Sequence, residues 1–526
     1  MTTLLLTGAK EAEALPSRRR TEVLALMCAA LGVVTAAFIS LNVALPSFAQ
    51  DTGATQTQLT WIVGAYGLVF AALLLPAGAL ADRLGRREVL VGGLAVFTLA
   101  SLAAAFVASP EAVIALRVVS AVGAAGVMPS TLSILTSIFP AEKRGRAVGA
   151  WAATAGGAGI IALVASGALL EAFSWQSVFV LNAVLGAPLL VAIARRVPTS
   201  RDPNPGPVDP VGVLLSVLGL GALVFGVIEG PERGWDSPLV LSTLVAGCVL
   251  LIGFVFWELR TKHPLLDPRL FRSPAFAAGS FAITMQFFAI FAFQFVSLQY
   301  LQQVSGYSAL RAGLALLPIG IILGVLAPRA PQLAARFGMR AVVGTGSALL
   351  AAGLLILAQL QVDTSYWHFL LGILVLGAGM ALGAAPATEA ILNGLPSSQQ
   401  GLASAVNDTT RELGGALGIA VLGSLLNLGY RGTIDDRLAD DGLREAARPS
   451  LQAAAQTAQG LGADGGGVLD VAQAAFVNGL HIAFYSGAGA VLLGTLVFLW
   501  LAPQGAPRHG DEPAVIQPRD PSPENR

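Results

Sequence analysis

The chain has 526 residues, of which 55% are hydrophobic and only 12% are charged, and its formal net charge is zero. A soluble protein of this length carries about a quarter charged residues, so lipid rather than water must surround most of this chain. The balance of 31 basic and 31 acidic residues excludes a global basic field for nucleic acid. The two cysteines, Cys28 and Cys248, lie inside apolar runs and predict neither a disulfide framework nor a metal centre.

Apolar runs long enough to cross a bilayer follow one another along the whole chain. A span needs about 20 mostly apolar residues, and the backbone inside a bilayer must satisfy its own hydrogen bonds, which favours helices. The first run follows Ser17–Arg20 and is too long for the core of a signal peptide, so we expect it to stay as an uncleaved span. The sequence predicts an all-α membrane protein with fourteen transmembrane helices, near residues 22–46, 59–81, 88–107, 111–138, 147–170, 175–194, 211–230, 238–257, 275–301, 309–329, 341–361, 367–391, 404–427 and 478–502.

The charges between these runs are segregated by side. If the N-terminus is cytoplasmic, the short outer loops hold only Arg233 and Arg311. The inner loops then hold Arg83, Arg86, Arg87, Lys143, Arg144, Arg146, Arg195, Arg196, Arg201, Arg260, Lys262, Arg269, Arg272, Arg329, Arg336 and Arg340. This bias follows the positive-inside rule and predicts that both termini are cytoplasmic.

A short sequence repeat divides the chain into two related halves. Leu80–Arg87 aligns with Leu333–Arg340 at five of eight positions, and each copy joins the second and third spans of a six-span group. Parallel repeats are typical of secondary transporters, which rock two bundles around a central site. We therefore expect two six-helix bundles plus two inserted helices, arranged as an N-terminal tail at 1–21, a first bundle at 22–195, a linker with the inserted helices at 196–274, a second bundle at 275–502 and a C-terminal tail at 503–526.

One long loop, at about 428–477, lies between the last two spans on the predicted outer side. It is rich in Ala, Gly and Asp, and Asp435, Asp436, Asp440 and Asp441 are clustered in it. This composition predicts short helices or disorder, and no catalytic site.

Several motifs occur in order along the spans. They are Asn42–Pro46 in the first span, Gly78–Arg87 after the second, Tyr300–Gln303 and Leu317-Pro318 in the ninth and tenth, and Gly401, Asn407, Arg411 and Gly418 in the thirteenth. Together they resemble the major facilitator superfamily and, within it, the fourteen-span branch of drug:proton antiporters of the multidrug efflux type. The resemblance covers roughly residues 22–502.

This resemblance implies the major-facilitator fold and a transport function. The implied function is secondary active export of hydrophobic or amphipathic compounds, such as drugs and antibiotics, across the bacterial cytoplasmic membrane by proton antiport with alternating access. The implied partners are a small-molecule substrate, protons and the lipid bilayer. Neither a cofactor, a metal nor a nucleic acid is expected, and the protein is expected to be a monomer.

Two departures from the branch leave alternatives open. Ala37 stands where members of the branch often carry an aspartate, and Ala162–Gly167 lacks the proline of their fifth span. A facilitator or metabolite exporter without proton coupling, an importer and a transporter-like sensor are therefore alternatives to a proton antiporter.

The loop between the second and third spans concentrates charge. Its arginines, Arg83 among them, either hold the loop on the cytoplasmic side or take part in gating. Asp82 adds nothing to the positive-inside bias, and the resemblance implies that it faces the N-terminal end of the thirteenth span, where the helix dipole favours a carboxylate. We expect Asp82 to latch the two halves when the cytoplasmic side is closed; the alternative is that these charges only set topology. Ala335 stands at the matching place in the second copy.

Ionisable residues inside the spans are candidates for proton coupling or gating, because charge within a membrane is costly. Arg117 resembles an arginine of the fourth span that is implicated in proton transfer in the family; the alternative is a side chain that snorkels to the outer interface. Asp408, Arg411 and Glu412 lie in the first turns of the thirteenth span, where structural pairing is the expected role. Glu389 has no partner nearby in the sequence and is the candidate carboxylate for a proton or a cationic substrate.

The ninth span is rich in Phe and Gln. Phe287, Phe291, Gln286 and Gln294, together with Asn42 of the first span, predict a roomy cavity for a large, amphipathic and weakly charged molecule. The phenylalanines alone also fit packing against lipid, but the two glutamines are harder to place there.

No motif supports an enzyme or an ATP-driven pump. His263, His368, His481 and His509 are scattered, and no His-Glu-x-x-His or paired-cysteine site occurs, so neither a catalytic nor a metal site is predicted. The lysines are Lys10, Lys143 and Lys262; none follows a glycine or precedes Ser or Thr, which excludes a phosphate-binding loop in this chain.

Overall fold

The computed structural model describes residues 5–6, 16–201, 208–395 and 400–502. Within them, fourteen helices are long and apolar enough to cross a membrane, which confirms the predicted number of spans and the all-α class. The tail predicted at 503–526 and most of the tail predicted at 1–21 lie outside the described residues.

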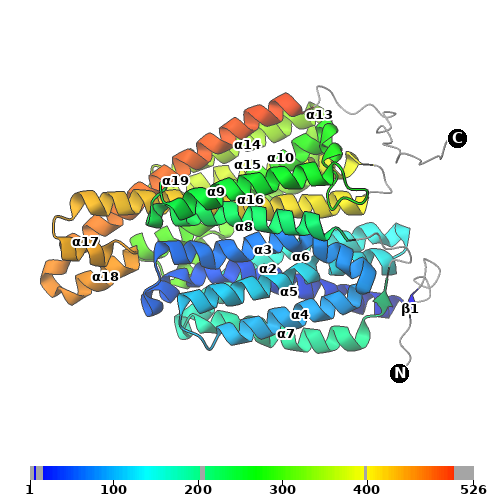
Figure 1. Cartoon of the computed structure of the whole chain (residues 1–526), viewed down its shortest axis with the longest axis horizontal. Helices are drawn as coiled ribbons and strands as arrows, with labels where there is room; N and C mark the ends of the chain where they lie inside the picture. The colour runs from blue at the N-terminus through cyan, green and yellow to red at the C-terminus, as the bar shows by residue number, and fades with distance from the viewer. Residues whose placement is uncertain (1–4, 7–15, 202–207, 396–399, 503–526) are drawn as a thin grey trace.

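The first six spanning helices pack together as one bundle (Figure 1). They are α2 (Ser17–Thr52), α3 (Gln56–Leu84), α4 (Arg86–Ala104), α5 (Pro110–Ile138), α6 (Ala141–Ala172) and α7 (Gln176–Arg196). Local sequence sets their ends: Thr55 and Gln58 form a reciprocal capping box at the start of α3, and Ser109 caps the start of α5. Beside this bundle, two-residue strands β1 (Leu5–Leu6) and β2 (Thr199–Ser200) pair in parallel.

The last six spans form the second bundle. They are α10 (Pro274–Gln299) with its π-helical end η2 (Tyr300–Val304), the broken span α11 (Ala309–Ala315), α12 (Leu317–Leu326), η3 (Ala327–Arg329) and α13 (Ala330–Phe337), then α14 (Met339–Leu357), α15 (Tyr366–Asn393), α16 (Gln400–Arg437) and α19 (Gly466–Leu501). Pro318 and Pro328 lie at two of the breaks in the tenth span, because proline lacks the N–H of a helix interior.

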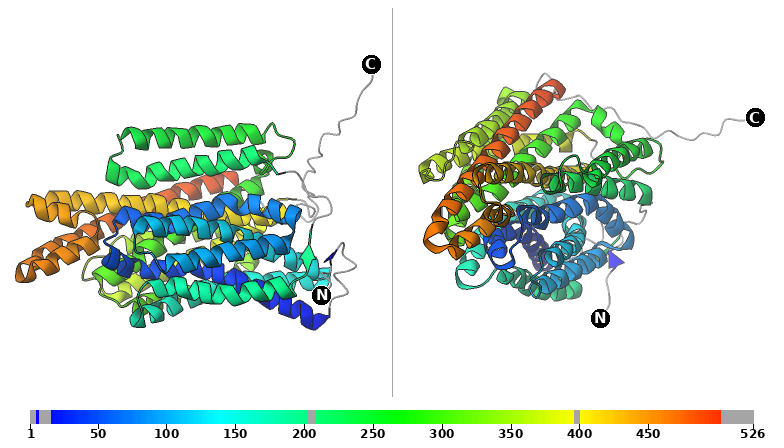
Figure 2. Two further views of the ribbon diagram at one scale, coloured as in Figure 1. Left: turned by 60° about the horizontal axis from the view of Figure 1, so that its bottom comes forward. Right: turned by 60° about the vertical axis from the view of Figure 1, so that its left-hand side comes forward.

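Between the bundles the chain forms a helical hairpin of α8 (Pro210–Arg233) and α9 (Pro238–Glu258), followed by the short 3₁₀ helix η1 (Pro268–Arg272). The hairpin lies along the side of the molecule (Figure 2, left). Val224 and Ile228 of α8 pack against Leu68 of α3 and against Ala416 and Ala420 of α16. The inserted helix α8 therefore contacts both bundles along one seam.

The repeated loop forms the same chain reversal in both bundles. Gly85 ends α3 with φ +119°, and Gly338 ends α13 with φ +86°. Each glycine N–H donates to the backbone carbonyl four residues earlier, Ala81 or Ala334. Because side chains disfavour positive φ, the glycine shared by the two copies has a structural reason.

The two ends of the molecule differ in their helices and in their charged junctions; both ends can be located in Figure 1. We call the end where α2 begins and α3 ends the basic end, and the opposite end, with α17 (Asp441–Ala447) and α18 (Leu451–Gly460), the cap end. Alternate helix directions bring the Arg-rich junctions, such as those at Arg83–Arg87 and Arg195–Arg196, to the basic end.

Two helices extend far beyond the expected membrane spans at the cap end. The sequence placed their ends near 427 and 478, but α16 continues to Arg437 and α19 already begins at Gly466. With 38 residues, α16 is about 57 Å long, against roughly 30 Å of hydrocarbon. The extension is held by local contacts, including the Arg448–Asp435 ion pair at 3.1 Å and the Tyr430 hydroxyl, which donates to the Ala447 carbonyl at 2.8 Å. The predicted short helices are found only between Asp441 and Gly465, because the extended ends of α16 and α19 take up the rest of this segment.

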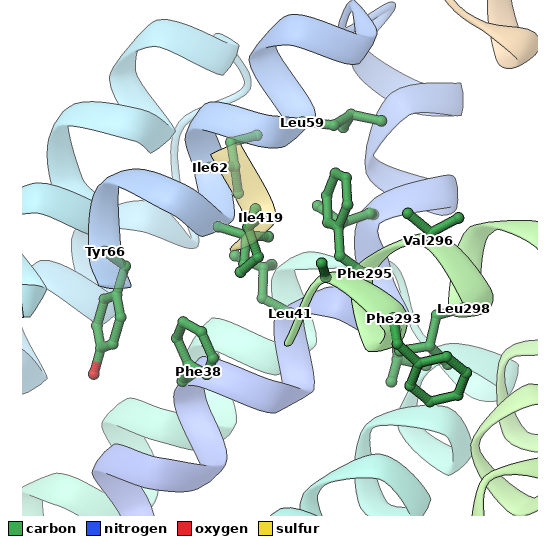
Figure 3. Packing of buried hydrophobic residues seen from close by; sticks show 14 of the residues in the cluster. Phe38, Leu41, Leu59, Ile62, Tyr66, Phe293, Phe295, Val296, Leu298 and Ile419 are labelled. Atoms are coloured by element: carbon green, nitrogen blue, oxygen red, sulfur yellow. The ribbon is translucent and has the colours of Figure 1, made fainter. Parts of the chain in front are cut away.

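The hydrophobic core continues from one bundle to the other. Phe38 and Tyr66 of the first bundle approach Phe293 and Phe295 of α10 and Ile419 of α16 (Figure 3). All five side chains are buried. The bundles therefore share one packed region at the centre of the molecule.

Candidate functional site

A cavity of about 580 Å³ lies between the two bundles. Its walls come from α2, α3, α5 and α6 of the first bundle and from α10, α12, η3, α15 and α16 of the second. A volume of this size suits a drug-sized molecule. Most lining side chains are apolar, so the few polar ones decide what else the cavity can bind.

Aromatic rings form a continuous series across the cavity. Phe38 lies 5.8 Å from Tyr66 and 5.0 Å from Phe291, measured between ring centroids. Phe287 lies 5.5 Å from Phe291 on the second bundle, and Phe70 lies 5.9 Å from Tyr66 on the first. These spacings are typical of favourable aromatic contacts. The predicted cavity residues Phe287 and Phe291 therefore do line the cavity, together with Gln294.

Two neighbouring residues of α16, Arg411 and Glu412, bring charge to the cavity wall. The Arg411 guanidinium lies 3.8 Å from the Asp408 carboxylate and 4.6 Å from the centroid of the Phe287 ring. This places Asp408 and Arg411 together, at the spacing that the sequence predicts. Glu412 has no hydrogen bond or ion pair with any residue that the structure describes, so its carboxyl group is available to a ligand or a proton.

The sequence groups Glu412 with Asp408 and Arg411 as a structural set and does not single it out. The available signal is helical geometry. Residues 408, 412, 415, 416 and 419 are spaced by three or four positions and share one helix face, and Gly415, Ala416 and Ile419 of that face meet α10 and α3. Because Glu412 lies on the face of α16 that meets the first bundle, it is a stronger candidate for proton coupling than its place beside Arg411 alone suggests.

Arg117 is buried beside the cavity rather than in its wall. It is 2% exposed, and its guanidinium carbon lies 3.9 Å from the centroid of the Tyr66 ring. It donates to the carbonyl oxygens of Ile62 at 3.2 Å and Ala37 at 3.5 Å, while its Nη2 atom has no partner among the described residues. Arg117 therefore joins α5 to α2 and α3, and no described carboxylate balances its charge.

Three other predicted residues lie outside the cavity wall. Asn42 is buried in α2 and donates to the Phe38 carbonyl at 3.2 Å. Gln286 is 1% exposed and lies against Gly383 of α15, with no hydrogen bond inside the described structure. Glu389 is exposed near the basic end of α15.

The predicted latch residues lie at the basic end of α3. Asp82 bonds to Arg86 of the same loop at 3.0 Å, and Arg86 also reaches the Ser133 carbonyl at 3.4 Å. Arg83 is exposed. Residues 396–399, which precede α16, lie outside the described residues. Within the described ranges, Asp82 makes its ion pair inside the first bundle.

The two bundles are joined by hydrogen bonds at the cap end. Among the residues that the structure describes, every side-chain hydrogen bond between the bundles lies there. They run from Gln302 to the Val43 carbonyl (3.0 Å), from Asn427 to Thr57 (3.0 Å), from Ser308 to Glu171 (2.6 Å) and from Gln456 to the Gln50 carbonyl (2.7 Å). These bonds hold the two bundles together at the cap end, whereas no side-chain hydrogen bond between the bundles is found at the basic end among the described residues.

Known proteins resemble this chain both in sequence and in fold. Residues 25–419 match the family described as Major Facilitator Superfamily. The chain is 34% identical to the multidrug efflux pump LfrA of Mycolicibacterium smegmatis, covering 89% of this chain and 94% of LfrA. It is 34% identical to the methyl viologen resistance protein SmvA of Salmonella typhimurium, covering 88% and 94% of the two chains. It is also 30% identical to the tetracenomycin C resistance and export protein of Streptomyces glaucescens, covering 89% of each.

Among solved structures, a bacterial homologue of the human lysosomal transporter Spinster, in an inward-facing and unoccupied conformation, superposes with a TM-score of 0.66. It is 17% identical, and the match covers 93% of this chain and all of that one. This likeness concerns the fold alone, whereas the sequence matches above extend over most of the chain. The chain belongs to the major facilitator superfamily.

Proposed function

We propose that this protein is a secondary active transporter that exports hydrophobic or amphipathic compounds across a bacterial cytoplasmic membrane in exchange for protons. The observation that carries the proposal is the central cavity between the two bundles. Its aromatic wall meets the carboxyl group of Glu412, which has no partner among the described residues. Two relatives are named for resistance to methyl viologen and for resistance to and export of tetracenomycin C, which supports export of such compounds here.

The direction of the molecule in the membrane follows from its charges. The junctions at the basic end hold most of the loop arginines, and the positive-inside rule places such an end in the cytoplasm. We place both termini in the cytoplasm, together with the end of the molecule at which no side-chain hydrogen bond joins the bundles among the described residues. A compound dissolved in the cytoplasm or in the inner leaflet has access to the aromatic wall in this conformation.

Proton exchange requires a group that changes charge as the cavity changes side. Glu412 meets this requirement because it faces the cavity and bonds to none of the described residues. In the outward-facing conformation its carboxyl group takes up a proton and the substrate leaves. In the inward-facing conformation it releases the proton to the cytoplasm, and the carboxylate together with Arg411 orients the next substrate.

Alternation between the two conformations exchanges one set of contacts for another. The hydrogen bonds between the bundles at the cap end break, and the basic end closes. In closing, Asp82 exchanges Arg86 for the N-terminal end of α16, where backbone N–H groups stabilise a carboxylate. Each wall of the cavity comes from this one chain, so we propose that a monomer is sufficient.

The test is a transport assay on the purified full-length protein in liposomes that hold a trapped pH dye, with no gradient imposed. Adding methyl viologen or tetracenomycin C is expected to move protons across the membrane. Glu412→Gln is expected to abolish the proton signal, while Glu445→Gln on the exposed surface of α17 leaves it unchanged. If Glu389→Gln abolishes it and Glu412→Gln does not, the coupling carboxylate is at the basic end of α15 instead.

Export without proton coupling is a second candidate, favoured by one observation. Arg117 bonds to the carbonyl of Ala37, at the position where the resemblance leads us to expect an acidic residue. The first bundle therefore lacks a carboxylate that could exchange a proton with Arg117. Substrate movement with no proton signal in the same liposomes would support this candidate and reject proton antiport.

A further inference from the structure

A second hollow lies on the side of the molecule, between the inserted helix α8 and the first bundle. It has a volume of about 770 Å³ and shares no lining residue with the central cavity. We call it the lateral groove. One wall is α3, with Leu80 and Leu84; the facing wall is α8, with Leu214 and Val217; α4 and α5 form the floor.

The lateral groove reaches from the basic end to about the middle of the membrane. Its lining on α3 runs from Leu84 back to Leu73, eleven positions that span about 16 Å of helix. Half of a typical hydrocarbon core is about 15 Å. The groove therefore has the depth of one leaflet and an apolar lining, which suits a single acyl chain.

Hydrogen bonds fix α8 to α3 and α16 at the end of α8 that lies away from the groove. At the other end of α8, Glu229 accepts a hydrogen bond from Trp61 of α3 at 2.7 Å, and the Val227 carbonyl accepts one from Ser424 of α16 at 2.7 Å. At the floor, the backbones of α4 and α5 pack directly against each other, because Gly93 and Gly123 have no side chains to separate them. Gly92 faces open space, with no atom within 4 Å of a Cβ built there.

Two arginines flank the residues that line the basic end of the groove. Arg83 precedes the lining residue Leu84 and is exposed, and the Arg201 Nε lies 3.1 Å from a Cβ built at Gly85. Neither arginine has a hydrogen bond or ion pair within the described part of the chain. One acid, Glu88, also lines the groove here: it accepts a hydrogen bond from Thr199 at 2.8 Å, and its other carboxylate oxygen lies beside Gly85, as Arg201 does. The two arginines therefore leave a net positive charge at this end of the groove. Two guanidinium groups beside one carboxylate favour a phosphate.

We propose that the lateral groove binds an anionic phospholipid, with one acyl chain between α8 and the first bundle and its phosphate at Arg83 and Arg201. The site differs from ordinary lipid contact because the chain is enclosed by α3 on one side and by α8 on the other. A lipid here fills the space that separates the inserted hairpin from the bundle. The inference concerns lipid binding and does not depend on the proposed transport function.

The test uses the full-length protein in nanodiscs of phosphatidylethanolamine and phosphatidylglycerol that contain a trace of phosphatidylglycerol with a diazirine in one acyl chain. After irradiation, the labelled peptides are identified by mass spectrometry. We expect the label to concentrate on the groove-lining peptides of α4 and α8. Gly92→Leu, which fills the open floor, is expected to lower that labelling several-fold, and Leu214→Trp is expected to do so from the opposite wall.

Two controls test whether the labelling is specific to the groove and to an anionic headgroup. Gly253→Leu on α9 also enters open space but lies outside the groove, so its labelling should equal that of the unmodified protein. Unlabelled phosphatidylglycerol should compete better than phosphatidylcholine, and Arg201→Gln should remove that difference.

Labelling that is unchanged in both groove-filling variants would overturn the proposal. So would displacement of the label by tetracenomycin C with no effect of phosphatidylglycerol, because the groove would then be a path for substrate.

Discussion

The two bundles differ in how they hold the charged residues compared here. In the first bundle, Arg117 is enclosed by backbone carbonyls and the Tyr66 ring, and Asp82 is paired with Arg86. In the second, Arg411 and Glu412 stand in the wall of the central cavity, and the carboxyl of Glu412 has no partner among the described residues. Under the proposed function, this difference divides the roles: the first bundle would supply shape and a latch, and the second would supply the group that exchanges the proton.

The largest effect is expected at Glu412. Glu412→Gln keeps the size of the side chain but cannot release a proton, so substrate-driven proton movement should fall to background in the liposome assay while substrate binding persists. Arg117→Lys serves as the comparison from the other bundle. It retains a cation and should reduce the rate without removing the coupling. If both variants lose proton coupling equally, the claim that only the second bundle supplies the proton-exchanging group is wrong.

The next effect is expected at the latch. Asp82→Asn removes the charge that a helix N-terminus stabilises by up to about 2 kcal/mol when partly buried, so transport should fall by roughly tenfold or more, with normal membrane insertion. Asp441→Asn breaks a comparable local pair with Arg444 at the cap end and should leave transport unchanged. Transport at the unmodified rate in the Asp82 variant would mean that this loop only sets topology.

A smaller change should come from giving Arg117 a counter-charge. Ala37→Asp places a carboxylate beside the guanidinium, which otherwise repels cations from the nearby aromatic wall. We expect the ratio of methyl viologen to tetracenomycin C transport to rise several-fold, measured by competition in the same vesicles. Ala37→Asn has nearly the same shape without the charge and should not shift the ratio; if it does, packing rather than charge is responsible.

The smallest effect is expected from one hydrogen bond at the cap end. Asn427→Leu removes the bond to Thr57, and a bond worth about 1 kcal/mol changes the conformational ratio about fivefold. Spin labels at Asp51→Cys and Gln459→Cys, with Cys28→Ser and Cys248→Ser, should report a larger fraction of long distances. Asn478→Leu removes a bond to Thr433 within the second bundle and should leave the distances as they are.

Much of the fold follows from the sequence, because lipid imposes a strict rule on span length and apolar content. All fourteen spans and the repeated loop are visible in that way. The extension of α16 to Arg437 is not, since Asp435, Asp436 and Arg437 read as a loop in hydropathy. Their helix is stabilised by contacts such as Arg448 with Asp435, which join residues that sequence spacing alone does not bring together.

The site was less predictable than the fold. The sequence predicts Phe287, Phe291 and Gln294 as cavity residues because aromatic and amide residues recur along α10, and all three line the cavity. Gln286, from the same pattern, faces α15 instead, since neighbouring helix positions point about 100° apart. The same rotation separates Glu412 from Arg411, and only the packing of α16 on α3 and α10 shows which of its faces meets the other bundle. The exposed position of Glu389 likewise depends on tertiary packing.

The length of α16 and α19 has a mechanical consequence for any movement of the two bundles. Each is a rod that continues from the transport core through the membrane and ends well outside it, so a small tilt at the cavity becomes a large displacement of α17 and α18. An antibody fragment raised against this projecting tip would therefore report, and could hold, the state of a cavity that it never touches.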